Sequence, residues 1–265
     1  MSDTGARILV AIPAIVFAAV IVSQGGPVFA VGAVLLGIVA MGELYGMMSR
    51  VRPAALAGFL ALVGMAAAAL YGDQHQILLV LAASVPVTFV LSLLRPQRAH
   101  ISWAMAATFL GIVWIGLAFA HAILLRESGH GGALLLDVLI GTFLTDTCAY
   151  FVGRAWGSRP IAPQISPNKT LEGLIGGIVG GTFFFWLFAI AYQHDWFKGP
   201  DALLIGFCVA LATPLGDLFE SAIKRDLDVK DAGRLFGAHG GVLDRLDGLF
   251  FSVVVGFYVS QAVLG

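Results

Sequence analysis

Apolar residues run along this chain in long, nearly uninterrupted stretches that short polar segments separate. Nine such stretches are each 16–24 residues long. A helix rises about 1.5 Å per residue, so helices of this length can cross a hydrocarbon layer about 30 Å thick. The pattern predicts an all-α, polytopic integral membrane protein with about nine transmembrane helices, over residues 8–23, 28–48, 53–71, 76–94, 101–124, 133–153, 173–193, 202–220 and 242–263.

The composition supports lipid as the solvent. The chain of 265 residues is 59% hydrophobic and only 12% charged, whereas an ordinary soluble domain is about 25% charged. So few polar residues cannot cover a surface that faces water. The two cysteines lie inside apolar stretches without a spacing partner, so we expect neither a disulfide framework nor a cysteine metal site. We expect the lipid bilayer, and no nucleic acid, among the partners.

The basic residues indicate the orientation. With nine spans, 13 of the 15 Lys and Arg residues fall on the side of the N-terminus, and only Arg126 and Lys198 fall on the other side. Positive charge stays cytoplasmic during insertion, so the N-terminus is predicted inside and the C-terminus outside. The two longest connections, 154–172 and 221–241, then both face the cytoplasm.

The densest charge lies between residues 221 and 247. A loop that only anchored the protein to anionic lipid would be basic without the acids. Both signs in equal number suit a site that holds a divalent metal with carboxylates and a polyphosphate with Lys and Arg. A solvated loop of salt bridges is the alternative interpretation. The five basic residues are Lys224, Arg225, Lys230, Arg234 and Arg245, and the five acidic ones are Asp226, Asp228, Asp231, Asp244 and Asp247.

Three details favour the site. Asp244 and Asp247 are three positions apart at the start of the last predicted helix, so they share one face, where carboxylates at the membrane edge need a cation or a partner. Gly240 and Gly241 precede this helix and let the backbone approach a ligand, while its first N–H groups could bind phosphate. A third set shares one face at the end of the preceding helix: Asp217, Ser221 and Lys224.

These residues resemble the signature of the phosphatidate cytidylyltransferase family. The pattern is Ser-x-x-Lys-Arg-x4-Lys-Asp, followed by His-Gly-Gly-x-x-Asp-Arg-x-Asp. Gly237 departs from it, because the family commonly has Pro at this position. The matching residues are Ser221, Lys224, Arg225, Lys230, Asp231, His239, Gly240, Gly241, Asp244, Arg245 and Asp247.

A second segment, residues 146–173, is similar to the middle region of the same family. It contains Asp146 and the run Ser-Pro-Asn-Lys-Thr-Leu-Glu-Gly over residues 166–173, in which Asn168 replaces the usual Lys. From the residues alone, Ser166 can cap a helix that has Pro167 at its first position, and Lys169 adds positive charge beside the free N–H groups. A capped helix start without a binding role is the alternative.

The resemblance implies transfer of CMP from CTP to phosphatidic acid, with CDP-diacylglycerol and pyrophosphate as products. It implies Mg²⁺, with room for a second cation, on Asp231, Asp244 and Asp247 and on Asp146. Ser166, Lys169, Gly240 and Gly241 are the expected substrate-binding residues. The remaining site residues are expected to act on the phosphates of CTP and lipid: Ser221, Lys224, Arg225, Lys230, His239 and Arg245.

We interpret residues 1–265 as a single membrane domain, with N-terminal helices over 1–125 and catalytic helices over 126–265. The expected location is the bacterial inner membrane with the active site on the cytoplasmic side, and a homodimer stays open. Two alternatives remain: a CTP-dependent kinase of a polyprenol, and a cation-coupled transporter. The transporter would require an internal repeat, and the sequence shows none.

Two further features have structural interpretations. Glycines at 176, 177, 180 and 181 fall in the middle of a predicted span, where small residues allow close helix packing. Glu43 near the end of the second span is interpreted as a snorkelling or paired acid, and Asp137 as a residue with a structural partner.

Overall fold

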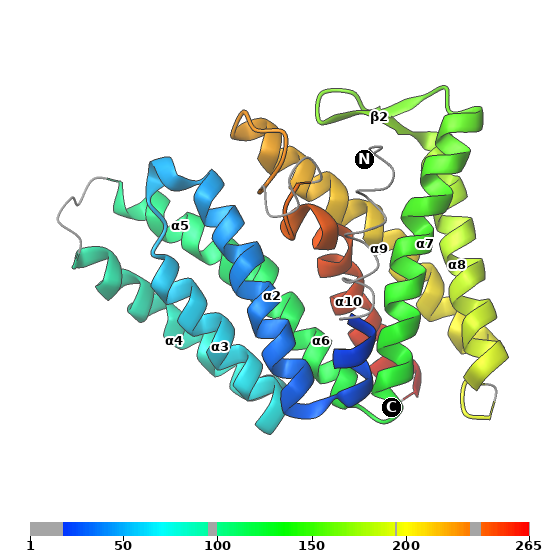
Figure 1. Ribbon diagram of the computed structural model, residues 1–265, viewed down its shortest axis with the longest axis horizontal. Coiled ribbons are helices and arrows are strands. Elements are labelled where there is room, and N and C mark those ends of the chain that lie inside the picture. The colour runs from blue at the N-terminus through cyan, green and yellow to red at the C-terminus, as the bar shows by residue number, and fades with distance from the viewer. Residues whose placement is uncertain (1–17, 95–99, 194, 234–239, 265) are drawn as a thin grey trace, which may run out of the picture. The chain divides into compact units, whose positions relative to one another are not determined.

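The computed structural model describes residues 18–94, 100–193, 195–233 and 240–264. Its elements are nearly all helical, and Figure 1 shows them in chain order. They are α2 (Gly26–Met47), the 3₁₀ turn η1 (Ser49–Val51), α3 (Ala55–Tyr71), α4 (Gln74–Leu93), α5 (Ile101–Gly111), the π turn η2 (Ile112–Gly116), α6 (Leu117–Glu127), α7 (Gly131–Trp156), β1 (Pro160–Ala162), β2 (Ser166–Thr170), α8 (Leu171–Gln193), α9 (Gly199–Asp226) and α10 (Leu243–Leu264).

Seven helices of the described chain are long and apolar enough to cross a membrane: α2, α4, the continuous run from α5 to α6, α7, α8, α9 and α10. Large apolar side chains such as Leu79 and Val179 face outward on them, with 55% and 64% of their surface exposed. In water this exposure would be unfavourable, whereas lipid accepts it. The prediction of an all-α protein is therefore confirmed for nearly all of the described chain, with helices that can span a membrane, and the short hairpin β1–β2 is the departure from it.

Two of the nine predicted spans differ. The stretch 53–71 forms α3, which has 17 residues and is shorter than the other apolar helices. The stretch 8–23 falls largely outside the described residues, and its described part, from residue 18, is helical. The count of nine spans therefore stays a prediction.

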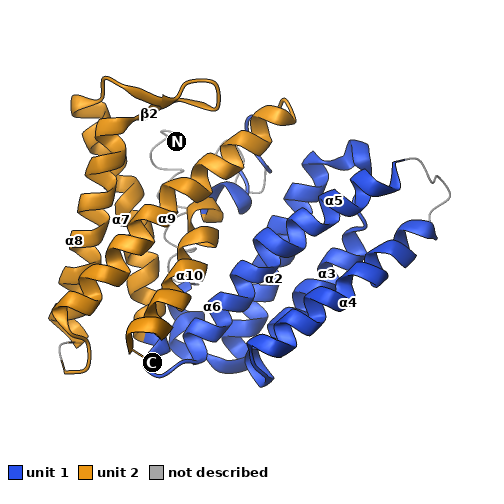
Figure 2. Cartoon of the chain, turned by 180° about the vertical axis from the view of Figure 1, so that it is seen from behind, with its two compact units in different colours: residues 1–132, 229–245 blue, residues 133–228, 246–265 orange. Residues whose placement is uncertain are grey.

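The contacts divide the chain into two compact units, coloured in Figure 2. The first comprises residues 1–132 and 229–245. Its helices α2, α3 and α6 pack around buried side chains that include Met41, Leu62 and Ile115. Polar groups inside it are paired, since the Tyr45 hydroxyl donates to the Thr108 carbonyl at 2.8 Å and the Thr108 hydroxyl accepts the Ala54 N–H at 2.7 Å.

The second unit comprises residues 133–228 and 246–265. Here α7 and α8 run side by side, and the short antiparallel hairpin β1–β2 joins them at one end (Figure 1). Thr142 on α7 shares a 2.7 Å hydrogen bond with Ser252 on α10. Asp137 on α7 accepts a 2.8 Å hydrogen bond from Gln193 on α8, which gives it the structural partner expected for a carboxylate in a span.

The hairpin corrects one prediction. Ser166 does not cap a helix: residues 166–170 form β2, in which Ser166 lies opposite Ala162, and α8 begins at Leu171. Thr170 is the cap instead, because its hydroxyl accepts the Gly173 N–H at 3.2 Å. Pairing with β1 satisfies the backbone of this segment as a strand, and the helix start moves four residues along the chain.

The glycines of α8 confirm their predicted packing role. A side chain at Gly176 would collide with Val152, one at Gly180 with Cys148, and one at Gly181 with Thr145. A β-carbon at Gly177 would lie 2.8 Å from the β-carbon of Ala149 and 2.9 Å from the carbonyl oxygen of Thr145. Without side chains on this face, α7 and α8 approach closely enough for backbone contact, which is how helices gain van der Waals energy in lipid.

We predict that Gly177→Ala lowers the free energy of unfolding by about 1–3 kcal/mol, the usual effect of overpacking. The matched control is Gly46→Ala in α2, because nothing lies within 4 Å of the β-carbon it would add. Thermal unfolding in detergent would compare the two variants with the parent chain. Equal melting temperatures for all three would contradict close packing at Gly177.

Candidate functional site

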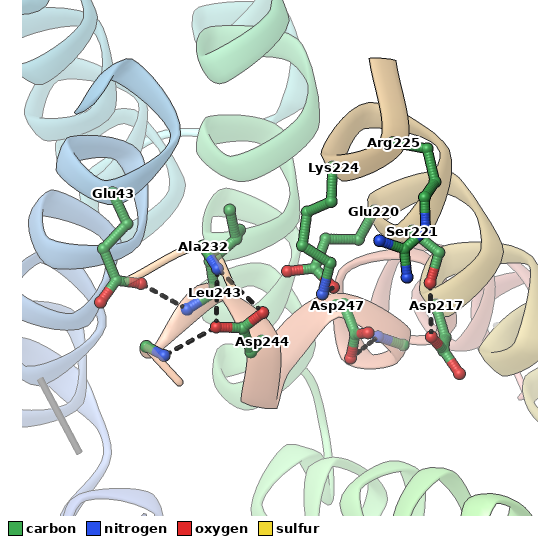
Figure 3. A network of polar contacts seen from close by, with 12 residues as sticks. Glu43, Asp217, Glu220, Ser221, Lys224, Arg225, Ala232, Leu243, Asp244 and Asp247 are labelled. Carbon is green, nitrogen blue, oxygen red and sulfur yellow. Dashed lines mark hydrogen bonds and ion pairs between the residues drawn. The ribbon is translucent and has the colours of Figure 1, made fainter. Parts of the chain in front are cut away.

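The C-terminal part of α9 gathers polar residues on one face. Asp217, Glu220, Ser221 and Lys224 follow one another at spacings of three, one and three residues, which places their side chains on the same side of a helix. The Ser221 hydroxyl donates to Asp217 at 3.4 Å, and the Lys224 ammonium pairs with Glu220 at 2.6 Å (Figure 3). The shared face of Asp217, Ser221 and Lys224 is therefore confirmed.

Glu220 was not predicted, although it is the most deeply buried member of this face, with 1% of its surface exposed. Its sequence signal is its spacing: it lies three residues after Asp217 and four residues before Lys224 in an otherwise apolar helix. A buried carboxylate needs a partner, and Lys224 provides it.

A close helix crossing places Asp247 against this face. A β-carbon at Gly216 would collide with the backbone of Asp247, and one at Gly248 would lie 3.0 Å from Thr213. Only glycine allows α9 and α10 to meet at this distance. Asp247 consequently interacts electrostatically with Asp217 and Lys224, and its carboxylate accepts the Gly248 N–H at 2.8 Å.

Asp146 on α7 and Lys169 on β2 complete this cluster. Asp146 is repelled by the carboxylates of Asp247 and Asp217 and attracted by the Lys169 ammonium. Lys169 forms an ion pair with Asp217 at 2.6 Å. We call these six residues the acidic cluster: Asp146, Lys169, Asp217, Glu220, Lys224 and Asp247.

The acidic cluster carries an excess of negative charge. Its four carboxylates face two ammonium groups, so its formal charge is −2 when all six groups are ionised. Hard oxygen donors and this charge fit a divalent cation such as Mg²⁺. Within the described ranges no three acidic, His or Cys side chains already stand in the arrangement of a metal site. The residues fit such an ion in charge and chemistry. Two of the carboxylates, those of Asp217 and Glu220, form ion pairs with lysines.

The hairpin is tied to α9 at two points. Besides the ion pair of Lys169, the guanidinium of Arg225 donates to the Ile165 carbonyl at 3.1 Å. At the base of the hairpin, Glu172 accepts hydrogen bonds from the backbone of Ser158 and Arg159 and pairs with the Arg159 guanidinium at 2.8 Å. These contacts hold the hairpin in place, and with it the position of Lys169 beside the other residues of the acidic cluster.

Asp244 belongs to a second set of contacts, in the first unit. Its carboxylate accepts the N–H groups of Ala232, at 3.0 Å, and of Gly241, at 2.7 Å. Glu43 on α2 accepts the next two N–H groups, that of Val242 at 3.1 Å and that of Leu243 at 2.8 Å. Figure 3 shows Glu43 beside Leu243 and Asp244. The N–H groups that were predicted to be free for phosphate thus already donate to two carboxylates, which the positive end of the α10 dipole also favours.

The remaining predicted residues are more exposed or lie outside the description. Lys230 and Asp231 are exposed residues shortly before Ala232, and Arg245 is exposed in the first turn of α10. Gly240 is buried with φ 78°, a conformation that favours glycine. His239 lies outside the described residues. Ser166 stands at the start of β2.

Comparison with known proteins assigns the family. Residues 5–263 match the family described as "Cytidylyltransferase family". A phosphatidate cytidylyltransferase of Staphylococcus epidermidis is 31% identical over 252 residues, which is 92% of this chain and 94% of that protein. Phosphatidate cytidylyltransferases of Mycobacterium leprae and Bacillus subtilis are each 39% identical, over 60% and 54% of this chain and 50% and 53% of their own lengths.

The matches to the M. leprae and B. subtilis proteins span only about half the length of those relatives. The match of the family covers nearly the whole of this chain and includes both polar segments singled out in the sequence. The chain belongs to the cytidylyltransferase family.

Proposed function

We propose that this protein transfers CMP from CTP to phosphatidic acid, giving CDP-diacylglycerol and pyrophosphate. The observation that carries the proposal is the acidic cluster, in which an excess of carboxylates and two lysines converge at the end of apolar helices. Such a site suits a cation and phosphates together. The family membership and the names of its relatives support the same substrates.

In the proposed reaction, a phosphate oxygen of phosphatidic acid attacks the α-phosphorus of CTP. A new P–O bond forms there, the bond from the α-phosphorus to the oxygen that bridges to the β-phosphorus breaks, and pyrophosphate leaves with that oxygen. The attacking oxygen arrives ionised, so no residue has to act as a nucleophile. Two polyanions must meet, so neutralising their charge is the main catalytic task.

We assign the residues accordingly. Asp146 and Asp247, joined by Asp217, would hold Mg²⁺, which supplies positive charge to the phosphates. Lys224 and Lys169 lie beside these carboxylates, where release from Glu220 and Asp217 would free their ammonium groups for phosphate oxygens. A second cation would need further ligands, for which Asp231 and Asp244 are the proposed residues.

The other residues are proposed to bind the substrates from around the cluster. Ser221 would hydrogen bond to a substrate phosphate. Gly241 could bind phosphate only if the phosphate replaced Asp244 as the partner of its N–H group. The rest would contact the triphosphate or the lipid phosphate: Arg225, Lys230, His239, Arg245, Ser166 and Gly240.

We also propose nine spans with the N-terminus in the cytoplasm of a bacterium and the protein in its inner membrane. The bias of basic residues supports this orientation. CTP would then reach the acidic cluster from the cytoplasm, while lipid would enter between helices. A homodimer stays a prediction.

We predict that the purified protein converts CTP, phosphatidic acid and Mg²⁺ into CDP-diacylglycerol and pyrophosphate. Asp247→Asn should lower kcat by about 10²-fold or more, because electrostatic groups of this kind contribute on that scale. Asp201→Asn, in the first turn of α9, is the matched control and should retain activity. CTP labelled in its α-phosphate or its γ-phosphate identifies the group transferred, and label reaching lipid only from the γ-phosphate would mean a lipid kinase instead.

We predict that Lys169→Met raises the KM for CTP by about 10–100-fold, since a charge-assisted contact to phosphate is worth about 1.5–3 kcal/mol. Lys198→Met, just before α9, is the control and should leave the KM unchanged. Initial rates over a range of CTP concentrations would measure both. An unchanged KM for Lys169→Met would remove this residue from the triphosphate site.

We predict that Gln164→Cys, in the turn of the hairpin, makes the protein react with a membrane-impermeant maleimide only when the cytoplasmic side is exposed. Cys148 and Cys208 would first be replaced by Ser, and Lys198→Cys should react from the other side. Labelling of intact cells and of inverted membrane vesicles measures the two accessibilities. Reaction of position 164 in intact cells would reverse the proposed orientation.

A further inference from the structure

Glu43 is the only charged residue of α2, a helix of 22 residues. It lies close to the C-terminal end of this helix, and its neighbours Met41 and Leu44 are fully buried. A carboxylate in such surroundings is unfavourable unless hydrogen-bond donors or a cation compensate it. The groups that compensate the carboxylate of Glu43 therefore indicate its role.

The donors come from the start of α10, about 200 residues away along the chain. One oxygen of Glu43 accepts the Val242 N–H at 3.1 Å, and the other accepts the Leu243 N–H at 2.8 Å. Helix starts are usually capped by a Ser, Thr, Asp or Asn of their own. Residues 240–243 read Gly-Gly-Val-Leu, so this start has no such side chain, and Glu43 supplies the missing cap from another helix.

Glycines make room for the carboxylate. A β-carbon at Gly241 or at Gly233 would collide with the carboxyl group of Glu43. Gly241 belongs to the pair of glycines interpreted from sequence as a phosphate approach. In the structure, the absence of a β-carbon at Gly241 leaves space for the carboxyl group of Glu43.

Asp244 works beside Glu43 on the same segment. It accepts the N–H groups of Gly241 and Ala232, so it joins the start of α10 to the loop at Ala232. The two carboxylates together engage three successive N–H groups, from Gly241 to Leu243. α10 continues without a break to Leu264, so a fixed first turn also fixes the direction in which Asp247, one turn later, projects.

We propose that Glu43 is a positioning residue for the reaction: it holds the first turn of α10, and through it Asp244, Arg245 and Asp247, in the orientation that cation and phosphate binding require. This rests on the proposed function for what the segment does, but the capping contact itself does not depend on that function. Glu43 touches no reacting atom in this proposal. Its role resembles that of the outer groups that orient metal ligands in other proteins, whose loss typically weakens metal affinity or activity 10–100-fold.

The test replaces Glu43 with Gln, which keeps the length of the side chain but offers one acceptor instead of two, and with Ala, which offers none. The control is Glu127→Gln, because Glu127 likewise accepts a backbone N–H of a distant helix start, that of Gly26 at 2.7 Å. All proteins are compared as purified full chains in detergent.

We expect amide hydrogen exchange over residues 240–245 to rise in Glu43→Gln and further in Glu43→Ala, and to stay unchanged in Glu127→Gln. The Mg²⁺ concentration that half-saturates activity should rise about tenfold in Glu43→Gln, with a melting temperature no lower than that of the control. Binding of Mn²⁺, followed by its paramagnetic signal, should weaken in the same order. If Glu43→Ala does not fold, Glu43→Gln alone decides the result.

Unchanged exchange over residues 240–245 in Glu43→Gln would overturn the capping role. Faster exchange with unchanged dependence on Mg²⁺ would overturn the positioning role and leave Glu43 a purely structural cap. Tighter CTP binding in Glu43→Gln would also overturn it, since Glu43 would then compete with phosphate for the helix start. If the parent chain makes no CDP-diacylglycerol, the proposed function fails, while exchange and Mn²⁺ binding still report on Glu43.

Discussion

A carboxylate at the edge of an apolar helix bundle must find a cation or hydrogen-bond donors, and the polar architecture of this chain follows from that requirement. The acidic residues of the two sets of contacts meet it in different ways. Glu220 takes a lysine of its own helix, and Asp217 takes a lysine from the hairpin. Glu43 and Asp244 take backbone N–H groups. Asp146 faces the carboxylates of Asp247 and Asp217 as well as the Lys169 ammonium, which is why we place the cation beside Asp146 and Asp247.

Helix packing without side chains brings these acids together. Gly216 and Gly248 let α9 and α10 cross at backbone distance, and the glycines of α8 do the same for α7. In lipid no hydrophobic drive pulls helices together, so close contact has to come from such small residues. The position of Asp247 relative to Asp217 therefore depends on the glycine at 216.

The sequence predicts what depends on neighbours along the chain. Hydrophobic runs identify the apolar helices, and helical spacing identifies the polar face of α9 and the packing face of α8. Prediction from the sequence fails where a segment far away along the chain determines the local conformation or the contact partner. Pairing with β1 turns residues 166–170 from an expected helix start into a strand. The partner of Glu43 lies about 200 residues away, so no local pattern identifies it. Glu220 could have been found from its spacing to Lys224.

The contact between Glu43 and the start of α10 also sets an order of events during synthesis. Ribosomes add about 5–20 residues per second, so roughly 10–40 s separate the two partners. Throughout that time the carboxylate of Glu43 lacks the N–H groups of Val242 and Leu243 that it finally accepts. Water or other donors have to satisfy it until α10 is made, so this end of α2 gains its final contacts only when residues 242 and 243 have been synthesised.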